Sequence, residues 1–477
     1  MLFSIAVTLL FLSFFAAVVF TGLLRNIAKQ RNWLIDIPNK SRKFHFRPTP
    51  LVGGIAIHLS MLLSTLFLLF LVDYKYDFKV VGFDWLKSSP DSQFVEKSYS
   101  QKLSVINNDS SQGAESYRIN LTTQDTPLDE PPLYDVRIGS SEDSQFQITQ
   151  INKNVFQVLL SDGTSKSFQL TDAGVLEVDP LGQPLGQVIN VKHAKGSLYS
   201  FSSFTIAFIL IAILLQAFTL IDDAVGMRPV KRLLGQSIAV LAVIILGNTF
   251  IDSLQISILG TSLQLGPWGI PFTIFAVVGV INAFNMIDGI NGLCAGFALI
   301  AMGALQVASG FHVSNYSLII AAGSIIGFLS YNLGLLGTQR RVFLGDNGST
   351  FLGFLVAWTC INYSQGESSL IMPVTCLWIV AIPLLDCVGV MFQRATQGVA
   401  PFNAGRDHIH HKLQDYLGSS WQTLIFLCSL GMLLASIGIV IEKTTQSSEI
   451  SLLIFLGVAA CYFIASNRLI KKTAADV

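Results

Sequence analysis

The feature that most constrains this chain is a series of eleven apolar runs, each long enough to cross a hydrocarbon core of ~30 Å. They cover residues 1–24, 51–72, 201–220, 233–250, 269–287, 293–311, 317–337, 349–364, 371–392, 421–441 and 448–466. A membrane span must satisfy its backbone hydrogen bonds internally, so each run is expected to form a helix. The sequence therefore predicts an all-α polytopic membrane protein with about 11 transmembrane helices.

Composition excludes the other broad classes. Charged residues make up 13% of the 477 residues, against roughly 25% in soluble domains, and hydrophobic residues make up 51%. The 34 phenylalanines exclude a disordered chain. All six cysteines lie in apolar stretches, so the sequence implies neither a disulfide framework nor a zinc-finger spacing.

The zero net charge conceals two different kinds of segment. Residues 73–200 carry 17 acidic and 11 basic side chains, a balance of −6, which leaves +6 elsewhere. From Phe146 onward, polar and apolar residues alternate as in strands, with a turn at Asp162-Gly163. We predict a β-rich extracytoplasmic domain at 73–200, inserted between transmembrane helices 1–2 (residues 1–72) and transmembrane helices 3–11 (residues 201–477).

The basic residues predict the orientation of the spans. Seven of them follow the first run, and the positive-inside rule places them in the cytoplasm: Arg25, Lys29, Arg31, Lys40, Arg42, Lys43 and Arg47. The N-terminus is then outside and the C-terminus cytoplasmic. The first run lacks a basic start and is too long for a signal peptide, so we expect it to be a retained span. The loop ends in Gly53-Gly54, which lets the backbone approach a neighbour closely.

Ionisable residues at the ends of spans are costly and are candidates for function. The third run ends in Asp222 and Asp223, followed by Lys231 and Arg232. Adjacent carboxylates repel each other, and a magnesium ion or another cation would relieve that repulsion. A solvated helix end remains the alternative.

Two further spans have polar cytoplasmic ends. In the fifth, Asn282, Asn285 and Asp288 recur every third residue along one helix face, with Asn291 just beyond. Contacts that only hold helices together are the alternative to a binding site here. The eighth begins at Asp346, where a helix N-terminus suits phosphate and the carboxylate suits a metal, unless an ordinary N-cap is all that is present.

Three of the seven histidines, His408, His410 and His411, lie within four residues and close to Arg406. His408 and His411 would share a face if this turn is helical. We favour a group that binds a diphosphate. A zinc site is less favoured because no cysteine lies close, and a purely structural loop remains open.

Together the motifs resemble those of the polyprenyl-phosphate N-acetylhexosamine-1-phosphate transferases. They are Pro50-Leu-Val-Gly-Gly54, Asp222-Asp223, the Asn282–Gly292 segment, Phe343-Leu-Gly-Asp346-x-Gly-Ser349 and His408-x-His-His411. The resemblance covers 1–72 and 201–477, and the insert has no counterpart. It implies a bacterial inner-membrane enzyme that transfers a sugar 1-phosphate from a UDP-N-acetylhexosamine to undecaprenyl phosphate, releases UMP and requires Mg²⁺, with Mn²⁺ as a substitute.

The resemblance also implies roles for individual residues. Asp346 and Asn285 would ligate Mg²⁺. Asp288 would shape the nucleotide pocket and Asn291 would contact the uracil. Catalysis at the lipid phosphate and the diphosphate would involve Asp222, Asp223 and His408. The diphosphate and the sugar would be bound by Lys231, Arg232, Arg406, His410 and His411.

The donor sugar and the competing classes complete these expectations. Ile409 interrupts the histidines, whereas the muramyl-pentapeptide branch tends to carry three in a row, so we favour UDP-N-acetylglucosamine and the start of O-antigen, common-antigen or teichoic-acid synthesis. The peptidoglycan donor remains the alternative within the family. A transporter would carry polar groups near the midplane, where only Asp386 lies, and we assign it a packing or ion-pair role near Arg394.

An inactive scaffold or sensor acting through its outer domain is the last alternative. We expect residues 73–200 to bind a periplasmic partner or a second copy of the protein, and we expect no nucleic acid.

Overall fold

The computed structural model describes residues 2–37, 47–75, 203–258, 261–310, 315–366, 369–400 and 405–475, together with the strands of the insert. The chain divides into two compact units. One comprises Met1–Tyr76, Asp84–Asp91 and Phe201–Val477, and the other comprises Asp77–Phe83 and Ser92–Ser200.

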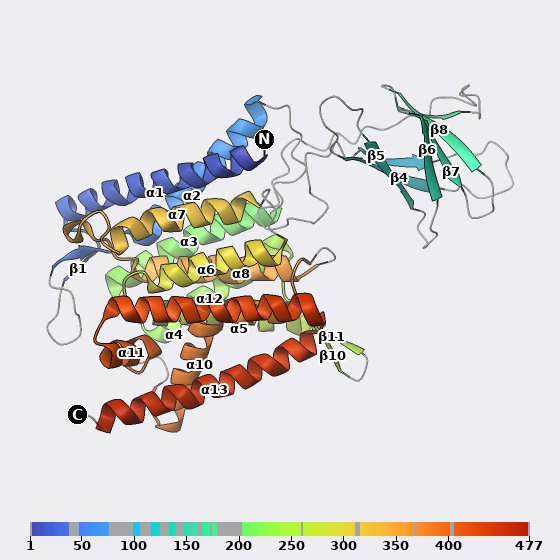
Figure 1. Ribbon diagram of the computed structural model, residues 1–477. Helices are drawn as coiled ribbons and strands as arrows, with labels where there is room; N and C mark the ends of the chain where they lie inside the picture. Colours follow the sequence, from blue (N-terminus) through green and yellow to red (C-terminus); the bar gives the residue numbers. More distant parts are fainter. Residues whose placement is uncertain are drawn as a thin grey trace. The chain divides into compact units, whose positions relative to one another are not determined.

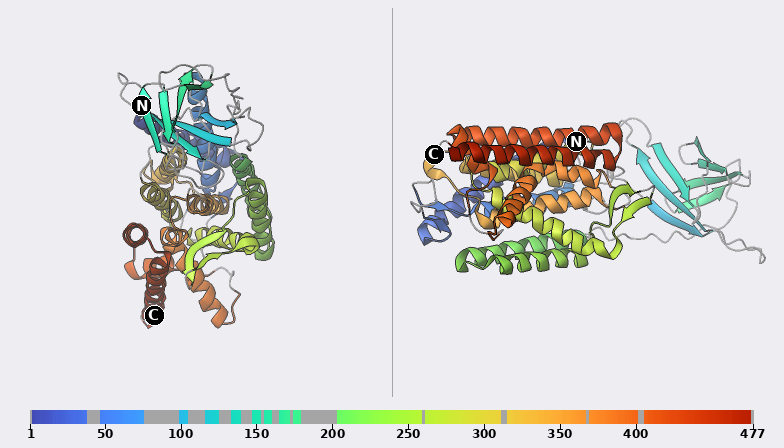
Figure 2. Two further views of the ribbon diagram at one scale, coloured as in Figure 1. Left: turned by 90° about the vertical axis from the view of Figure 1, so that its right-hand side faces the viewer. Right: turned by 90° about the horizontal axis from the view of Figure 1, so that it is seen from below.

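The first unit is helical, and Figures 1 and 2 show most of its helices running side by side. Within the described residues it contains α1 (Leu2–Arg31), α2 (Gly53–Lys75), α3 (Ser203–Val225), α4 (Pro229–Gly247), α5 (Gly269–Ile287), α6 (Leu293–Ala308), α7 (Tyr316–Asn332), α8 (Gly345–Ser364), α9 (Pro373–Ile379), α10 (Ala381–Thr396), α11 (Ile409–Leu417), α12 (Ser420–Thr445), α13 (Ser448–Ala475) and the 3₁₀ turns η1 (Gly266–Trp268) and η2 (Thr338–Arg340). Each apolar run coincides with one helix, except that 371–392 is divided between α9 and α10.

Five helices of the described residues are long and apolar enough to cross a membrane, or six if the bent pair α9–α10 counts as one. The five are Ile5–Arg31, Pro229–Gly247, Gly266–Ile287, Ser420–Thr445 and Ser448–Ser466. Shorter apolar helical segments lie at Gly53–Leu68, Phe208–Asp222, Leu293–Ala308 and Tyr316–Asn332. The chain is therefore a mostly helical, multi-pass membrane protein, and the number eleven stays a prediction.

Short strands complete the described part of the chain. In the insert, β3 (Tyr99–Ser104), β4 (Ser116–Gln124) and β5 (Leu133–Gly139) form one antiparallel sheet, and β6 (Gln147–Asn152), β7 (Val155–Leu159), β8 (Ser165–Thr171) and β9 (Gly174–Val178) form another. In the helical unit, β1 (Ile35–Asp36) pairs with β2 (Thr49–Pro50), and β10 (Ser253–Ile258) pairs with β11 (Thr261–Gln264). The position of the insert relative to a membrane stays a prediction.

Helix α8 is the core of the helical unit. Almost every one of its residues is buried, and it packs against α2, α3, α5 and α6. At Gly353, an added Cβ would lie 2.8 Å from Ile281 Cα, so α5 approaches to backbone distance. Because protein rather than lipid surrounds α8, it can bury polar residues such as Asn347 and Thr359.

The start of α2 fixes the start of α8. Gly53 and Gly54 donate backbone hydrogen bonds to the carbonyl oxygens of Phe343 and Leu344, at 3.1 and 3.3 Å. A Cβ on Gly54 would overlap the Oδ1 of Asn347 as well as α8 backbone. The prediction that the glycine pair permits a close backbone approach is confirmed.

The chain turns sharply between α9 and α10, whose axes differ by 81°. Trp378, fully buried at the end of α9, donates a hydrogen bond from Nε1 to Ser451 Oγ of α13 at 3.1 Å and packs on Gly438 of α12. In Figure 1, α10 runs steeply across the direction of α12. The turn leads into α10, whose Asp386 accepts a hydrogen bond from Ile409 N–H at the start of the short helix α11.

We expect Gly54→Ala to lower the free energy of unfolding by about 1–3 kcal/mol, because the new methyl group has no room beside Asn347. Thermal unfolding of the purified protein in detergent would measure this. Gly279→Ala is the matched control, since an added Cβ in α5 meets nothing within 4 Å. Equal stability of the two variants would contradict the close approach.

Candidate functional site

Arg232 connects carboxylates from two helices. Its Nε lies 2.6 Å from Asp222 Oδ2, and its Nη1 lies 3.2 Å from Asp346 Oδ2. Asp222, in the last turn of α3, is 1% exposed, whereas Asp346, in the first turn of α8, is 45% exposed. One guanidinium thus neutralises a buried carboxylate and holds a second one at the surface.

The sequence after α3 explains this geometry. Gly226 has a φ of 69° and donates a hydrogen bond to Asp222 O at 2.7 Å, while Met227 N–H donates to Asp222 Oδ1 at 2.8 Å. Pro229 then starts α4, where its missing N–H costs nothing. The tight turn lays α4 against α3 and brings Arg232 beside Asp222.

The predicted partners of this pair are placed differently. Lys231 is exposed, so of the two adjacent basic residues it is Arg232 that reaches the carboxylates. The backbone of Asp223 belongs to α3, but its side chain lies outside the described residues. Lys40, Arg42 and Lys43 of the first basic loop are also outside them.

The loop between α5 and α6 carries Asp288 and Asn291. Loss of hydration, followed by the nearby charge of Asp346, raises the pKa of Asp288 to about 7. Gly292, with a φ of 85°, donates a hydrogen bond to Asn332 Oδ1 at 2.6 Å. Asn332 in turn donates a hydrogen bond to Val342 O at 2.9 Å and so connects this loop to the segment before α8.

Asn332 supports the site but was not among the predicted site residues. Its only sequence signal is an amide within an otherwise apolar run. The polar stripe of α5 divides in two. Asn282 donates to Gln236 Oε1 at 2.8 Å and so holds α5 to α4, whereas the buried Nδ2 of Asn285 has no hydrogen-bond partner among the described residues. Asn285 is therefore the member of the stripe with unused polar capacity.

The histidines lie at the start of α11. His408 precedes the helix and has an extended backbone. The turn is therefore not helical at His408, and the shared helical face with His411 that a helix would have given is not formed. Its ring stacks with that of His410 at 5.7 Å, and the His410 and His411 rings are 4.1 Å apart. His408 Nδ1 lies 2.8 Å from Asp386 Oδ2, and Ile409 N–H donates to Asp386 Oδ1 at 2.8 Å.

Asp386 therefore pairs with His408 and not with Arg394, which binds Asp407 at 2.9 Å. Asp386 therefore has the ion-pair role expected for it, with His408 of the candidate site as its partner. Sequence spacing favoured Arg394 because both lie on α10, but the start of α11 brings His408 and Ile409 N–H to Asp386. Arg406 pairs with Asp415 at 2.9 Å, and both side chains are about half exposed.

His410 connects the histidines of α11 with the loop between α5 and α6. A Cβ on Gly289 would overlap its Nε2, so the ring lies against the loop that carries Asp288. Burial, with the charges of His411, His408 and Arg406, lowers the pKa of His410 well below its usual range. The neutral ring offers one donor and one acceptor, and neither has a partner among the described residues. Such a buried imidazole favours a polar ligand at this position.

The residues present fit a magnesium ion better than zinc. Within the described residues, no three His, Cys, Asp or Glu side chains gather as a metal cage. Mg²⁺ needs no such cage, because it commonly binds one or two carboxylates and the phosphates of the substrate. The repulsion between Asp288 and Asp346 is the observation that favours a cation here.

Comparison with known proteins identifies the class. Residues 205–364, which include Asp222, Asp288 and Asp346, match the model of glycosyl transferase family 4. A relative from Haemophilus influenzae, an undecaprenyl-phosphate alpha-N-acetylglucosaminyl 1-phosphate transferase, is 38% identical over 253 residues, which are 51% of this chain and 68% of that protein. The chain belongs to glycosyl transferase family 4.

Proteins of the same name from Escherichia coli O157:H7 and Yersinia pestis are 37% and 36% identical to this chain. Each match covers 50% of this chain and 65% or 66% of the relative. The chain thus spans just under two thirds of the length of these relatives.

We expect Asp288→Asn to raise the unfolding temperature by a few degrees at about pH 8 without added divalent metal. The raised pKa means that charging Asp288 costs more in the folded protein than in the unfolded chain. The cost is complete above about pH 7 and shrinks as the pH falls toward 4, so the gain should be smaller at about pH 5. Asp252→Asn, at an exposed acid, is the control. A gain that does not change with pH would contradict the argument.

Proposed function

We propose that the chain transfers N-acetylglucosamine 1-phosphate from UDP-N-acetylglucosamine to undecaprenyl phosphate. An oxygen of the lipid phosphate attacks the phosphorus next to the sugar, the bond from that phosphorus to the UMP oxygen breaks, and UMP leaves. The names of the relatives support this reaction. The observation that carries it in this chain is the bridge from Asp222 through Arg232 to Asp346.

At the acceptor side, Asp222 and Asp223 orient the lipid phosphate or remove its proton. Arg232 supplies the positive charge that lets a phosphate approach a buried carboxylate. Asp346 and Asn285 would hold Mg²⁺, or Mn²⁺ in its place. Once bound, the metal would neutralise charge on the diphosphate.

At the donor side, Asp288 and Asn291 lie on one loop and would contact the nucleotide. Arg406, His408 and His411 would bind the diphosphate, and neutral His410 suits a sugar hydroxyl or a phosphate oxygen. Phosphoryl transfer depends mainly on positioning and charge, which this set of residues supplies without a covalent intermediate.

The reaction would take place at the cytoplasmic face of a bacterial inner membrane, with the N-terminus outside, the C-terminus inside and eleven spans. Figure 1 supports a single face, because β1, α11 and the last turn of α13 lie at the same end of the helical unit. Residues 73–200, most of which belong to the second compact unit, would then lie outside and bind a periplasmic partner or a second copy.

The test is release of UMP by the purified full chain given undecaprenyl phosphate, Mg²⁺ and either UDP-N-acetylglucosamine or the muramyl-pentapeptide donor. Asp346→Asn should lower turnover by more than about 100-fold, because it removes the charge of a metal ligand. Asp252→Asn, which removes an exposed charge elsewhere, should leave turnover unchanged.

Near-normal turnover of Asp346→Asn at limiting Mg²⁺ would contradict the metal assignment. No release with either donor, from folded protein, would contradict the transferase itself and favour the scaffold.

Asp386 is expected to act as a positioning residue for His408. Asp386→Asn leaves a single acceptor oxygen for two donors, the His408 ring and Ile409 N–H, so His408 should lose its orientation. We expect the KM for UDP-N-acetylglucosamine to rise by about tenfold and the KM for undecaprenyl phosphate to stay unchanged.

Tyr462→Phe is the control for Asp386→Asn, because that hydroxyl lies 3.5 Å from Asp386 Oδ1 and contributes little. A lower unfolding temperature with both KM values unchanged would show that Asp386 only stabilises the fold.

A further inference from the structure

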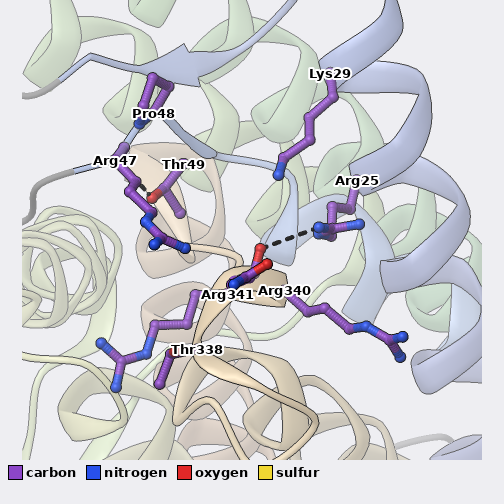
Figure 3. Close-up of a pocket in the computed structure, with 9 residues that line it drawn as sticks. Arg25, Lys29, Arg47, Pro48, Thr49, Thr338, Arg340 and Arg341 are labelled. Carbon is purple, nitrogen blue, oxygen red and sulfur yellow. Dashed lines mark hydrogen bonds between the residues drawn. The ribbon is translucent and has the colours of Figure 1, made fainter.

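A basic cavity lies at the end of α1, beside the loops that start α2 and α8. Its volume is about 290 Å³. Figure 3 shows its walls, which are Arg25, Lys29, Arg47, Pro48, Thr49, Thr338, Gln339, Arg340 and Arg341. Five of these described residues are cationic and none is acidic. The nearest acid along β1, Asp36, lies opposite Thr49 in the strand pair but does not line the cavity.

Two of the cationic side chains, Arg25 and Arg341, are held by contacts within the fold. Arg25 and Lys29 are four residues apart and share one face of α1. Arg25 Nη2 donates a hydrogen bond to Gln339 O at 3.1 Å, which links α1 to η2. Arg341 packs over Gly334, where an added Cβ would lie 2.8 Å from its Nε. Arg25 and Arg341 therefore each have a contact that holds them near the cavity.

Two of these arginines keep unused donors. The Nε atoms of Arg25 and Arg341 are buried and have no hydrogen-bond partner among the described residues. Buried donors without a partner are costly, and those of a guanidinium match the oxygens of a phosphate. The volume is at the lower limit for a ligand pocket, so it suits a phosphate group and not a whole nucleotide sugar.

The cavity is distinct from the transferase site but joined to it. None of the residues proposed for transfer lines it. Phe343 N–H donates to Pro50 O at 2.9 Å, and Gly53 N–H donates back to Phe343 O at 3.1 Å. Thr49 and Arg341 therefore lie directly before the two segments that position Asp346.

The geometry points to a second phosphate-binding site, in which these cations bind a phosphate group outside the Asp222–Asp346 cluster. The group is the headgroup of an anionic lipid or a soluble phosphate, because both present the same oxygens. Basic residues at the cytoplasmic end of a span are where an anionic headgroup would be met.

The test compares two ligands with the purified full chain. Native mass spectrometry would count phosphatidylglycerol molecules bound in detergent, with phosphatidylcholine as the uncharged comparison, and calorimetry would measure binding of inorganic phosphate. Lys29→Gln and Arg25→Gln should each weaken binding by about tenfold. Arg31→Gln is the matched control, because Arg31 is exposed on the same helix and does not line the cavity.

Weaker binding of phosphatidylglycerol alone would identify a lipid headgroup, and weaker binding of inorganic phosphate alone would identify a soluble ligand. A loss in both arms also supports the site. Lys29 is exposed, so its variant should keep the wild-type unfolding temperature. Equal binding by all four proteins in both arms, or no binding by the wild type, would overturn the proposal.

Discussion

The enclosure of α8 by α2, α3, α5 and α6 is the constraint on which the helical unit depends. A helix surrounded by protein needs no apolar face toward lipid, so its first turn can present Asp346 while Asn347 beside it is fully buried. The same enclosure demands close backbone contacts, which Gly54 and Gly353 permit. Asp346, one of the two carboxylates that Arg232 binds, is thereby held on a rigid helix and not on a loop.

The helices could be predicted because a membrane imposes both length and hydropathy on its spans, and every apolar run coincides with helix. The bend inside residues 371–392 could not be predicted from the sequence. Pro373 and Pro383 mark a weak place in the run, but the 81° turn depends on the packing of Trp378 against α12 and α13. Contacts so distant in sequence leave no local pattern.

The same distinction applies to the site. Carboxylates and histidines were conspicuous because charged groups at span ends are rare. Their pairings were not conspicuous, because spacing along one helix suggested Arg394 as the partner of Asp386, whereas the partner is His408, 22 residues away in the segment just before α11. Asn332 escaped notice because a single amide in an apolar run resembles many structural residues, and its partners Gly292 and Val342 are apart in sequence.

The turn between α9 and α10 also sets an order of assembly. Trp378 holds that turn through Gly438 and Ser451, which the ribosome adds 60 and 73 residues later. The Asp222–Arg232–Asp346 bridge uses only residues made earlier. During synthesis this bridge can therefore form first, while the turn that leads to Asp386 gains its support from Trp378 only when the final two helices have been made.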